Sequence, residues 1–138
     1  TSSDTYTISA KLTDDDTGSH EQMTTVTVNN VAPVLTLNAV TAINENGIAT
    51  LTGTYTDTGT LDTHTLEINW GDNSPLQTVI VTGGTFTVTH QYLDDTPTNT
   101  PSDDYTITAT LADDDTGTDT KMTTVTVNNV APVLTLNA

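Results

Sequence analysis

The sequence contains no cysteine, no arginine and only two lysines, and each shortage narrows what the protein can do. Without cysteine there is no disulfide framework, no thiol nucleophile and no cysteine-bound zinc. The two lysines stand against 18 acidic residues, so the formal net charge is −16. Nucleic-acid phosphates and anionic membrane surfaces both attract clustered basic side chains, and we therefore exclude both as partners. The partner that this charge favours is a cation.

Long apolar runs are also missing, and aromatic residues are scarce. No apolar stretch approaches the roughly 18 residues that a membrane-spanning helix needs, so we expect no membrane insertion. Aromatic residues make up 4% of the chain. Threonine accounts for 36 of the 138 residues, and its branched β-carbon favours strands over helices. Such a composition is typical of exported bacterial proteins, so we expect an extracellular protein, either secreted or at the cell surface.

One stretch of the chain occurs twice. Residues 1–39 align with residues 100–138 at an offset of 99 residues, and 30 of the 39 aligned positions are identical. Self-similarity at a fixed spacing is typical of a tandem array. We expect three parts: residues 1–30 as the C-terminal part of a preceding repeat, residues 31–129 as one complete repeat, and residues 130–138 as the first strand of a following repeat.

The predicted junction between repeats is the segment Asn29–Pro33, which recurs as Asn128–Pro132. It is very short, and its proline restricts the backbone. Units joined in this way cannot reorient as freely as units on a glycine- and serine-rich linker. The sequence therefore predicts an extended, semi-rigid array.

Alternating apolar and polar residues, bounded by Gly, Asp, Asn and Pro, predict short strands throughout the complete repeat. No window has the three-to-four spacing of a helix. Seven or eight short strands in about 100 residues are typical of an immunoglobulin-like β-sandwich. The predicted strands lie at residues 48–57, 63–70, 77–82, 85–92, 105–112, 122–128 and 133–136. In this interpretation Trp70, Tyr92 and His90 belong to the core rather than to a ligand site.

Three motifs stand out in the complete repeat: INWGDNSP at Ile68–Pro75, THQY at Thr89–Tyr92, and the strand and acidic turn at Tyr105–Gly117. Together they resemble the PKD (polycystic kidney disease) domain family, in particular the bacterial repeats of large surface proteins. The resemblance implies an immunoglobulin-like sandwich, extracellular placement, and a role in adhesion, spacing or binding rather than catalysis. Two departures are Asn73, where the family usually has glycine, and a longer stretch between Tyr92 and Tyr105.

The acidic triplet Asp113, Asp114 and Asp115, with its twin Asp14, Asp15 and Asp16, is a candidate calcium site. Calcium prefers six to eight oxygen ligands from a loop that can wrap around it. Asp113 and Asp115 project to the same side of an extended loop, and Gly117 is free to take a positive φ. The alternative is a solvated acidic hairpin that binds no metal.

A second group of candidate calcium ligands comprises Asp57, Asp62, Asp72 and Glu45. Asp57 ends one predicted strand and Asp62 precedes the next, whereas Asp72 follows Trp70 at the far end of its strand. The resemblance to the PKD family implies that Asp57, Asp62 and Glu45 lie near the junction with the preceding repeat, where Asp14, Asp15 and Asp16 of that repeat would join them. A calcium ion there would bridge two repeats.

These observations favour a structural function. The sequence has no local Ser–His–Asp arrangement, so we predict that the protein is not an enzyme. The favoured hypothesis is a repeat of an adhesin shaft, stalk or filament, stiffened by calcium. Its partners would be neighbouring repeats, and identical chains in a fibre if strands exchange between them. The alternative is an accessory module that binds carbohydrate or protein on a sheet face.

Overall fold

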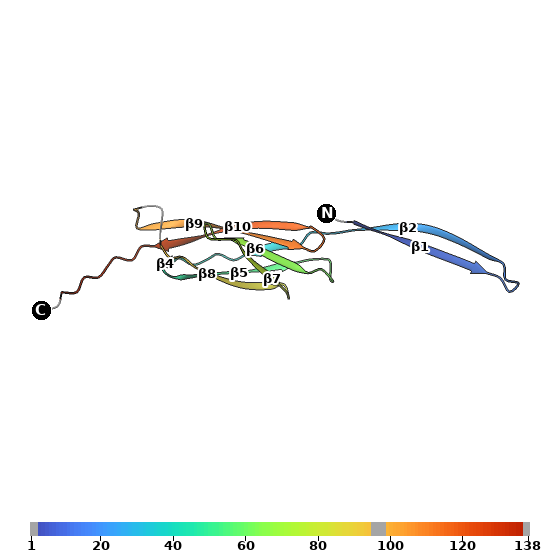
Figure 1. Ribbon diagram of the computed structural model, residues 1–138, viewed down its shortest axis with the longest axis horizontal. Helices are drawn as coiled ribbons and strands as arrows, with labels where there is room; N and C mark the ends of the chain where they lie inside the picture. The colour runs from blue at the N-terminus through green and yellow to red at the C-terminus, as the bar shows by residue number, and fades with distance from the viewer. Residues whose placement is uncertain (1–2, 95–98, 137–138) are drawn as a thin grey trace.

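The protein is described from a computed structural model, in which residues 3–94 and 99–136 are placed. Over these ranges all regular structure is β-strand, which confirms the predicted all-β class (Figure 1). No helix in the described ranges is long and apolar enough to cross a membrane. The strands are β1 (Ser3–Thr13), β2 (Ser19–Asn29), β3 (Val34–Leu37), β4 (Ile43–Asn44), β5 (Ile48–Thr56), β6 (His64–Asn69), β7 (Gln77–Val81), β8 (Thr85–Gln91), β9 (Ser102–Asp113) and β10 (Thr118–Asn128).

Strands β3 to β10 form two sheets that share one core. The larger sheet has the order β4-β10-β9-β6-β7, and the smaller has the order β3-β5-β8. The β4–β10 pair is parallel, and every other pair among the described residues is antiparallel. Both sheets contribute to a single cluster of buried apolar side chains, an arrangement compatible with a β-sandwich.

The predicted alternation places the core side chains correctly. In β9, Tyr105, Ile107, Ala109 and Leu111 are buried, and the residues between them are partly or fully exposed. Trp70 lies in the core, as expected, and its main-chain oxygen accepts a hydrogen bond of 2.7 Å from the Tyr92 hydroxyl. Each large apolar side chain removed from water stabilises the fold by about 1.5–3 kcal/mol. The alternation thus fixes both the inner face of each strand and the burial of the tryptophan.

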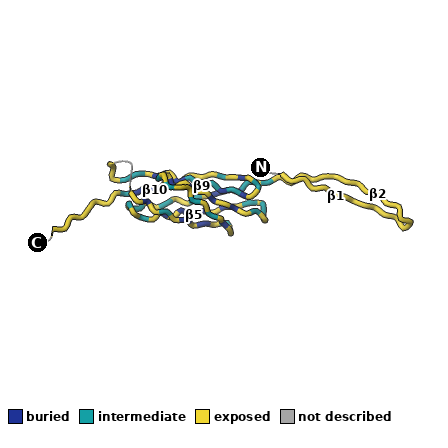
Figure 2. Tube along the Cα trace, viewed as in Figure 1, coloured by how far each residue is buried: buried dark blue, intermediate teal, exposed yellow. Residues whose placement is uncertain are grey.

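Strands β1 and β2 form a hairpin outside the two sheets, which we call the outer hairpin. It extends away from one end of the sandwich, and its residues are exposed along both strands (Figures 1 and 2). We call β9–β10 the inner hairpin. The two hairpins have the same register 99 residues apart, since Ser3 pairs with Asn29 and Ser102 pairs with Asn128. The boundaries of the three repeats stay a prediction.

The strand predicted at Val133–Leu136 does not form. Residues 131–136 have no ladder partner in the described chain, whereas the same sequence at Val34–Leu37 is β3 and pairs with β5. The segment becomes a strand only where a neighbouring strand satisfies its backbone groups. Within the longer stretch between Tyr92 and Tyr105, residues 95–98 lie outside the described residues.

Candidate functional site

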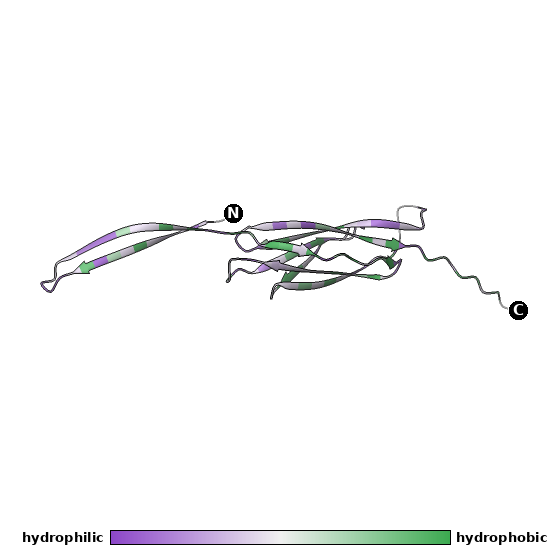
Figure 3. Ribbon diagram, turned by 180° about the vertical axis from the view of Figure 1, so that it is seen from behind, coloured by the Kyte–Doolittle hydropathy of each residue, from purple (hydrophilic) through white to green (hydrophobic). Residues whose placement is uncertain are grey.

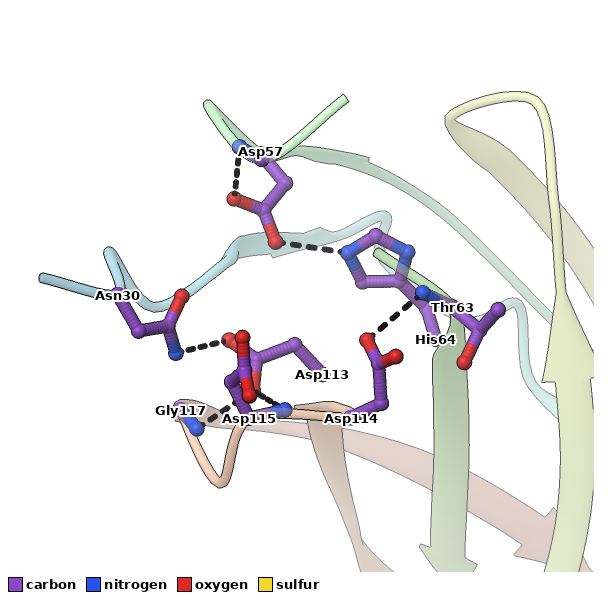
Figure 4. Close-up of polar contacts among 9 residues, drawn as sticks. Asn30, Asp57, Thr63, His64, Asp113, Asp114, Asp115 and Gly117 are labelled. Atoms are coloured by element: carbon purple, nitrogen blue, oxygen red, sulfur yellow. Dashed lines mark hydrogen bonds and ion pairs between the residues drawn. The ribbon is translucent and has the colours of Figure 1, made fainter. Parts of the chain in front are cut away.

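An acidic cluster lies at the end of the sandwich that faces the outer hairpin. Asp57 follows β5, Asp62 precedes β6, and Asp113 ends β9. One carboxylate oxygen from each of the three lies within 4.8 Å of the others. Figure 4 shows the surrounding hydrogen bonds, which include contacts to Asn30 in the linker. Three oxygens so close together are suited to a hard cation such as calcium.

Asp113 is nearly buried and organises the tip of the inner hairpin. Its Oδ1 accepts hydrogen bonds from the main-chain nitrogens of Asp115 at 3.0 Å and Gly117 at 2.6 Å. Its Oδ2 accepts a hydrogen bond of 2.8 Å from Asn30 Nδ2. The aspartate therefore fastens the hairpin turn and the linker at the same time.

Gly117 does not have the positive φ that the sequence led us to expect. The positive φ of this turn belongs to Thr116, at 72°, and not to the glycine. Gly117 is needed for space instead, because a β-carbon there would collide with the Asp113 carboxylate. It would also lie 2.8 Å from Ala32 Cα and 2.9 Å from Asn30 Nδ2. The hairpin tip and the linker thus pack against each other with no room for a side chain.

Asp57 is held by two hydrogen bonds. Its Oδ2 lies 2.8 Å from His64 Nε2, and its Oδ1 accepts a hydrogen bond of 3.0 Å from the Gly59 main-chain nitrogen. Burial favours the neutral form of Asp57, but the hydrogen bond with His64 and the other contacts outweigh it, so its pKa lies below the usual value. Asp57 therefore stays ionised at the centre of the cluster.

The pKa of Asp62 is shifted in the opposite direction, above its usual value. Partial desolvation raises its pKa, and the negative charges of Asp57, Asp114, Asp113 and Asp115 raise it further. Lys121, one of the two lysines of the chain, pairs instead with Asp119 at 2.7 Å. A bound divalent cation would remove this repulsion, since an opposite charge nearby favours the ionised carboxylate.

The remaining two aspartates of the triplet lie beside the same cluster. Asp114 Oδ1 accepts a hydrogen bond of 2.9 Å from the Thr63 main-chain nitrogen, which ties the inner hairpin to the loop before β6. Asp115 and Asp62 line a hollow of about 240 Å³ together with Asn30 and Val31 of the linker. The cluster therefore borders the junction between the sandwich and the outer hairpin.

Other predicted ligands lie elsewhere. Asp72 is bonded to His90, with 2.7 Å between Oδ2 and Nε2, in the contact network around Trp70. Glu45 lies at the opposite junction, where its Oε1 accepts a hydrogen bond of 2.6 Å from the Val130 main-chain nitrogen.

The twin triplet Asp14, Asp15 and Asp16 forms the tip of the outer hairpin, at the end of the molecule farthest from the sandwich (Figure 1). The structure therefore does not bring Glu45, Asp72 or the twin triplet to Asp57 and Asp62. It brings the inner triplet there instead.

Asn30 belongs to the candidate site and is not among the ligands expected from the sequence. Its side chain connects the linker to Asp113, and its counterpart Asn129 occupies the same place in the second junction. The sequence signal for it is the Asn–Asn pair that recurs at both junctions, at residues 29–30 and 128–129. Comparison with models of known protein families and with curated proteins found no match to this chain. The resemblance to the PKD family stays a prediction.

Proposed function

We propose that this chain is a non-catalytic structural repeat of a large extracellular bacterial protein, with a PKD-type, immunoglobulin-like unit that serves in an adhesin shaft, stalk or filament. The observation that supports this most directly is the way in which both linkers are bonded to the sandwich. They leave it at opposite ends, and each is held by hydrogen bonds (Figure 1).

The linker before the sandwich is fixed on its downstream side. Asn30 donates to the nearly buried Asp113 carboxylate, and Pro33 is fully buried. The tip of the inner hairpin packs against Ala32 so closely that there is no room for a β-carbon at Gly117. A linker with a buried proline and a hydrogen bond to a charged, desolvated group has few conformations open to it.

The linker after the sandwich is fixed on its upstream side. The main-chain nitrogen of Asn129 donates to the Pro101 carbonyl at 3.0 Å, and that of Val130 donates to Glu45. Asn128 Nδ2 donates to the Ile43 carbonyl at 3.1 Å. In an array, the position shared by Asn30 and Asn129 would bond to the preceding unit through its backbone and to the following unit through its side chain. Such a junction resists bending.

Calcium is the cation that we propose for the acidic cluster. Asp57, Asp62 and Asp113 offer only carboxylate oxygens, which suit a hard divalent ion, and each such oxygen has lone pairs beyond its hydrogen bonds. An ion there would offset two of the three carboxylate charges beside Asn30 and so strengthen the junction. This is a proposal about charge and ligand type, and it assigns no coordination geometry.

The alternative binding module requires exposed aromatic side chains. In the described part of the complete sandwich, the aromatic side chains belong to Tyr55, Trp70, Phe86, Tyr92 and Tyr105. All of them are at most 8% exposed. No specific observation therefore favours a carbohydrate-binding face.

Small-angle scattering on a protein of four consecutive units tests the proposal. We expect the maximum dimension to grow by a constant increment with each added unit, and Asn→Ala at every Asn30 position to reduce the apparent stiffness. The linkers would not be structural if the scattering matched that of freely jointed domains in both proteins, with calcium and without it.

A further inference from the structure

One long side of the sandwich ends in two strand edges that no described strand covers. In the larger sheet β7 pairs only with β6, and in the smaller sheet β8 pairs only with β5. The two strands follow each other in the chain but belong to different sheets, and a groove of about 510 Å³ lies between them. Each edge therefore has backbone N–H and C=O groups with no ladder partner among the described residues.

The opposite side of the sandwich is closed. Its edge strand in the smaller sheet is β3, and the Leu35 main-chain nitrogen donates a hydrogen bond of 2.8 Å to the Asp119 carboxylate of β10, in the larger sheet. Its edge strand in the larger sheet is β4, which has only two residues. Short strands and covering contacts are common means by which proteins prevent pairing at sheet edges. The side formed by β7 and β8 lacks both.

Strand β7 also lacks the residues that usually protect an edge. Edge strands commonly have charged side chains, proline or a bulge. The segment Gln77–Thr82 has no charge and no proline, and the register of β7 with β6 is unbroken. The residues that line the groove are all uncharged, although the chain has a net charge of −16. Ile80 of β7 is 80% exposed, whereas β8 exposes only threonine and glutamine side chains.

Neighbouring units of an array would leave this side open. The strands run along the sandwich, and the outer hairpin and the C-terminal linker extend from its two ends (Figures 1 and 3). A unit attached at either end would lie beyond the strands and not beside them. The open edge is therefore a feature of the complete sandwich itself.

We propose that β7 of one copy pairs antiparallel with β7 of a second copy, so that the two larger sheets become one continuous sheet. An antiparallel ladder is symmetric, so a strand can pair with an identical strand about a two-fold axis. The exposed Ile80 side chain of each copy would then be covered by the other strand. This contact uses the side of the unit and needs neither calcium nor stiff linkers, and so it goes beyond the proposed function.

The distribution of charge favours this edge as the contact between copies. Each chain has a net charge of −16, so most of its surface repels a second copy. Glu67 is the acidic residue of β6, where it pairs with Thr78. In the joined sheet the two Glu67 positions would be three strand spacings apart, or about 14 Å. Since charges are screened over about 8 Å at physiological ionic strength, the two neutral edges can meet with little repulsion.

A single pair of edges is a small contact. Stable and specific interfaces bury about 1,200–2,000 Å² in total. Strand β7 has five residues, so we expect the single chain to dimerise weakly. In the array proposed above, the same edge would recur in every unit, and two arrays running in opposite directions would pair at many units at once. Linked contacts of this kind bind far more tightly than one alone. Only this last step rests on the proposed array.

Cysteine substitutions test the contact in the 138-residue chain, which has no cysteine of its own. Ile80→Cys places a thiol on β7. Ile48→Cys is the matched control, because Ile48 is 62% exposed and lies on β5 in the smaller sheet. With a short bis-maleimide reagent, we expect Ile80→Cys to form linked dimers at least about tenfold faster, because pairing holds the two thiols at a high effective concentration. Equal rates would overturn the proposal.

Glutamate substitutions test the same contact without a reagent. Ile80→Glu and Ile48→Glu change the net charge equally, and both should melt like the wild type because both side chains are exposed. In sedimentation up to millimolar concentration, we expect Ile80→Glu to dimerise at least about tenfold more weakly than Ile48→Glu, because a charge on a strand edge opposes pairing. Association through any other surface would be the same in both variants.

The edge contact is ruled out if the two glutamate variants associate alike. The stiffness of linked units, measured by scattering as described above, should not change with Ile80→Glu. Edge pairing and the proposed array can therefore fail independently.

Discussion

Replacing Gly117 with alanine is expected to destabilise the sandwich by pushing the inner hairpin away from the linker. The added β-carbon would collide with the Asp113 carboxylate and would crowd Ala32 Cα at 2.8 Å and Asn30 Nδ2 at 2.9 Å. The contact with Ala32 is to backbone, which cannot rotate away. The φ of Gly117 is not in the left-handed region, so the cost comes from crowding and not from backbone strain.

Overpacking of this kind costs about 1–3 kcal/mol. For a domain of about 100 residues, each kcal/mol lowers the melting temperature by about 4–8 °C. We therefore expect Gly117→Ala to melt at least about 4 °C below the wild type, measured by the fluorescence of Trp70 in a thermal scan. Loss of the Asn30–Asp113 hydrogen bond would add to this shift.

Gly18→Ala is the matched control, because Gly18 occupies the same position in the outer hairpin. The nearest atoms that a β-carbon there would meet all belong to the Asp14 carboxylate, and no linker residue is among them. This variant should leave the melting of the sandwich unchanged. Two results would contradict this reasoning: Gly117→Ala could melt at the same temperature as the wild type, or both alanine variants could lower the melting temperature equally. Either result would mean that the tight fit between the hairpin tip and the linker does not contribute to stability.

Three further predictions concern the cluster and the linker. Asn30→Ala should lower the free energy of unfolding by about 1.5–3 kcal/mol in urea titrations, because a hydrogen bond to a charged group is lost; an unchanged midpoint would contradict this. The lowered pKa of Asp57 means that its contribution to stability is complete above its unfolded pKa, near 3.9, and is lost as the pH falls through its lower folded pKa. The variant Asp57→Asn should accordingly show a shallower loss of stability in acid than the wild type, and parallel curves would refute the assignment. Calcium should raise the melting temperature of the wild type, because an ion that binds only the folded state stabilises it, and should raise that of Asp62→Asn less; equal shifts would exclude Asp62 as a ligand.

The sequence predicts the faces of the strands well and the strand order poorly. Alternation identified the buried sides of β5 and β9 because a half-buried strand requires it. It could not show that β6 lies next to β9, where His64 pairs with Asp113. That pairing brings Asp113 to Asp57 and Asp62, which are about 50 residues away in the chain. Proximity across a sheet depends on the packing of whole strands, which local periodicity does not encode.

The location of the acidic loops shows the same limit. The twin triplet Asp14–Asp16 is close in sequence to the junction, and the expectation placed it there. Strands β1 and β2 are 11 residues each, so the tip lies roughly 35 Å from Asn29. The inner triplet, which is late in the repeat, returns to the start of the sandwich for the same reason. A long hairpin can thus place a segment far from a junction that is close to it in sequence, and it can bring together residues that are far apart in sequence.

The connection of the sandwich at opposite ends has a mechanical consequence. A force applied to the two linkers would enter at β3 and leave at β10, and it would act along the strands. Hydrogen bonds between antiparallel strands lie across that direction, so the bonds of a ladder would be loaded together in shear rather than opened one at a time. Rupture would then require many bonds to fail at once, and the unit would withstand tension along its length better than tension across it.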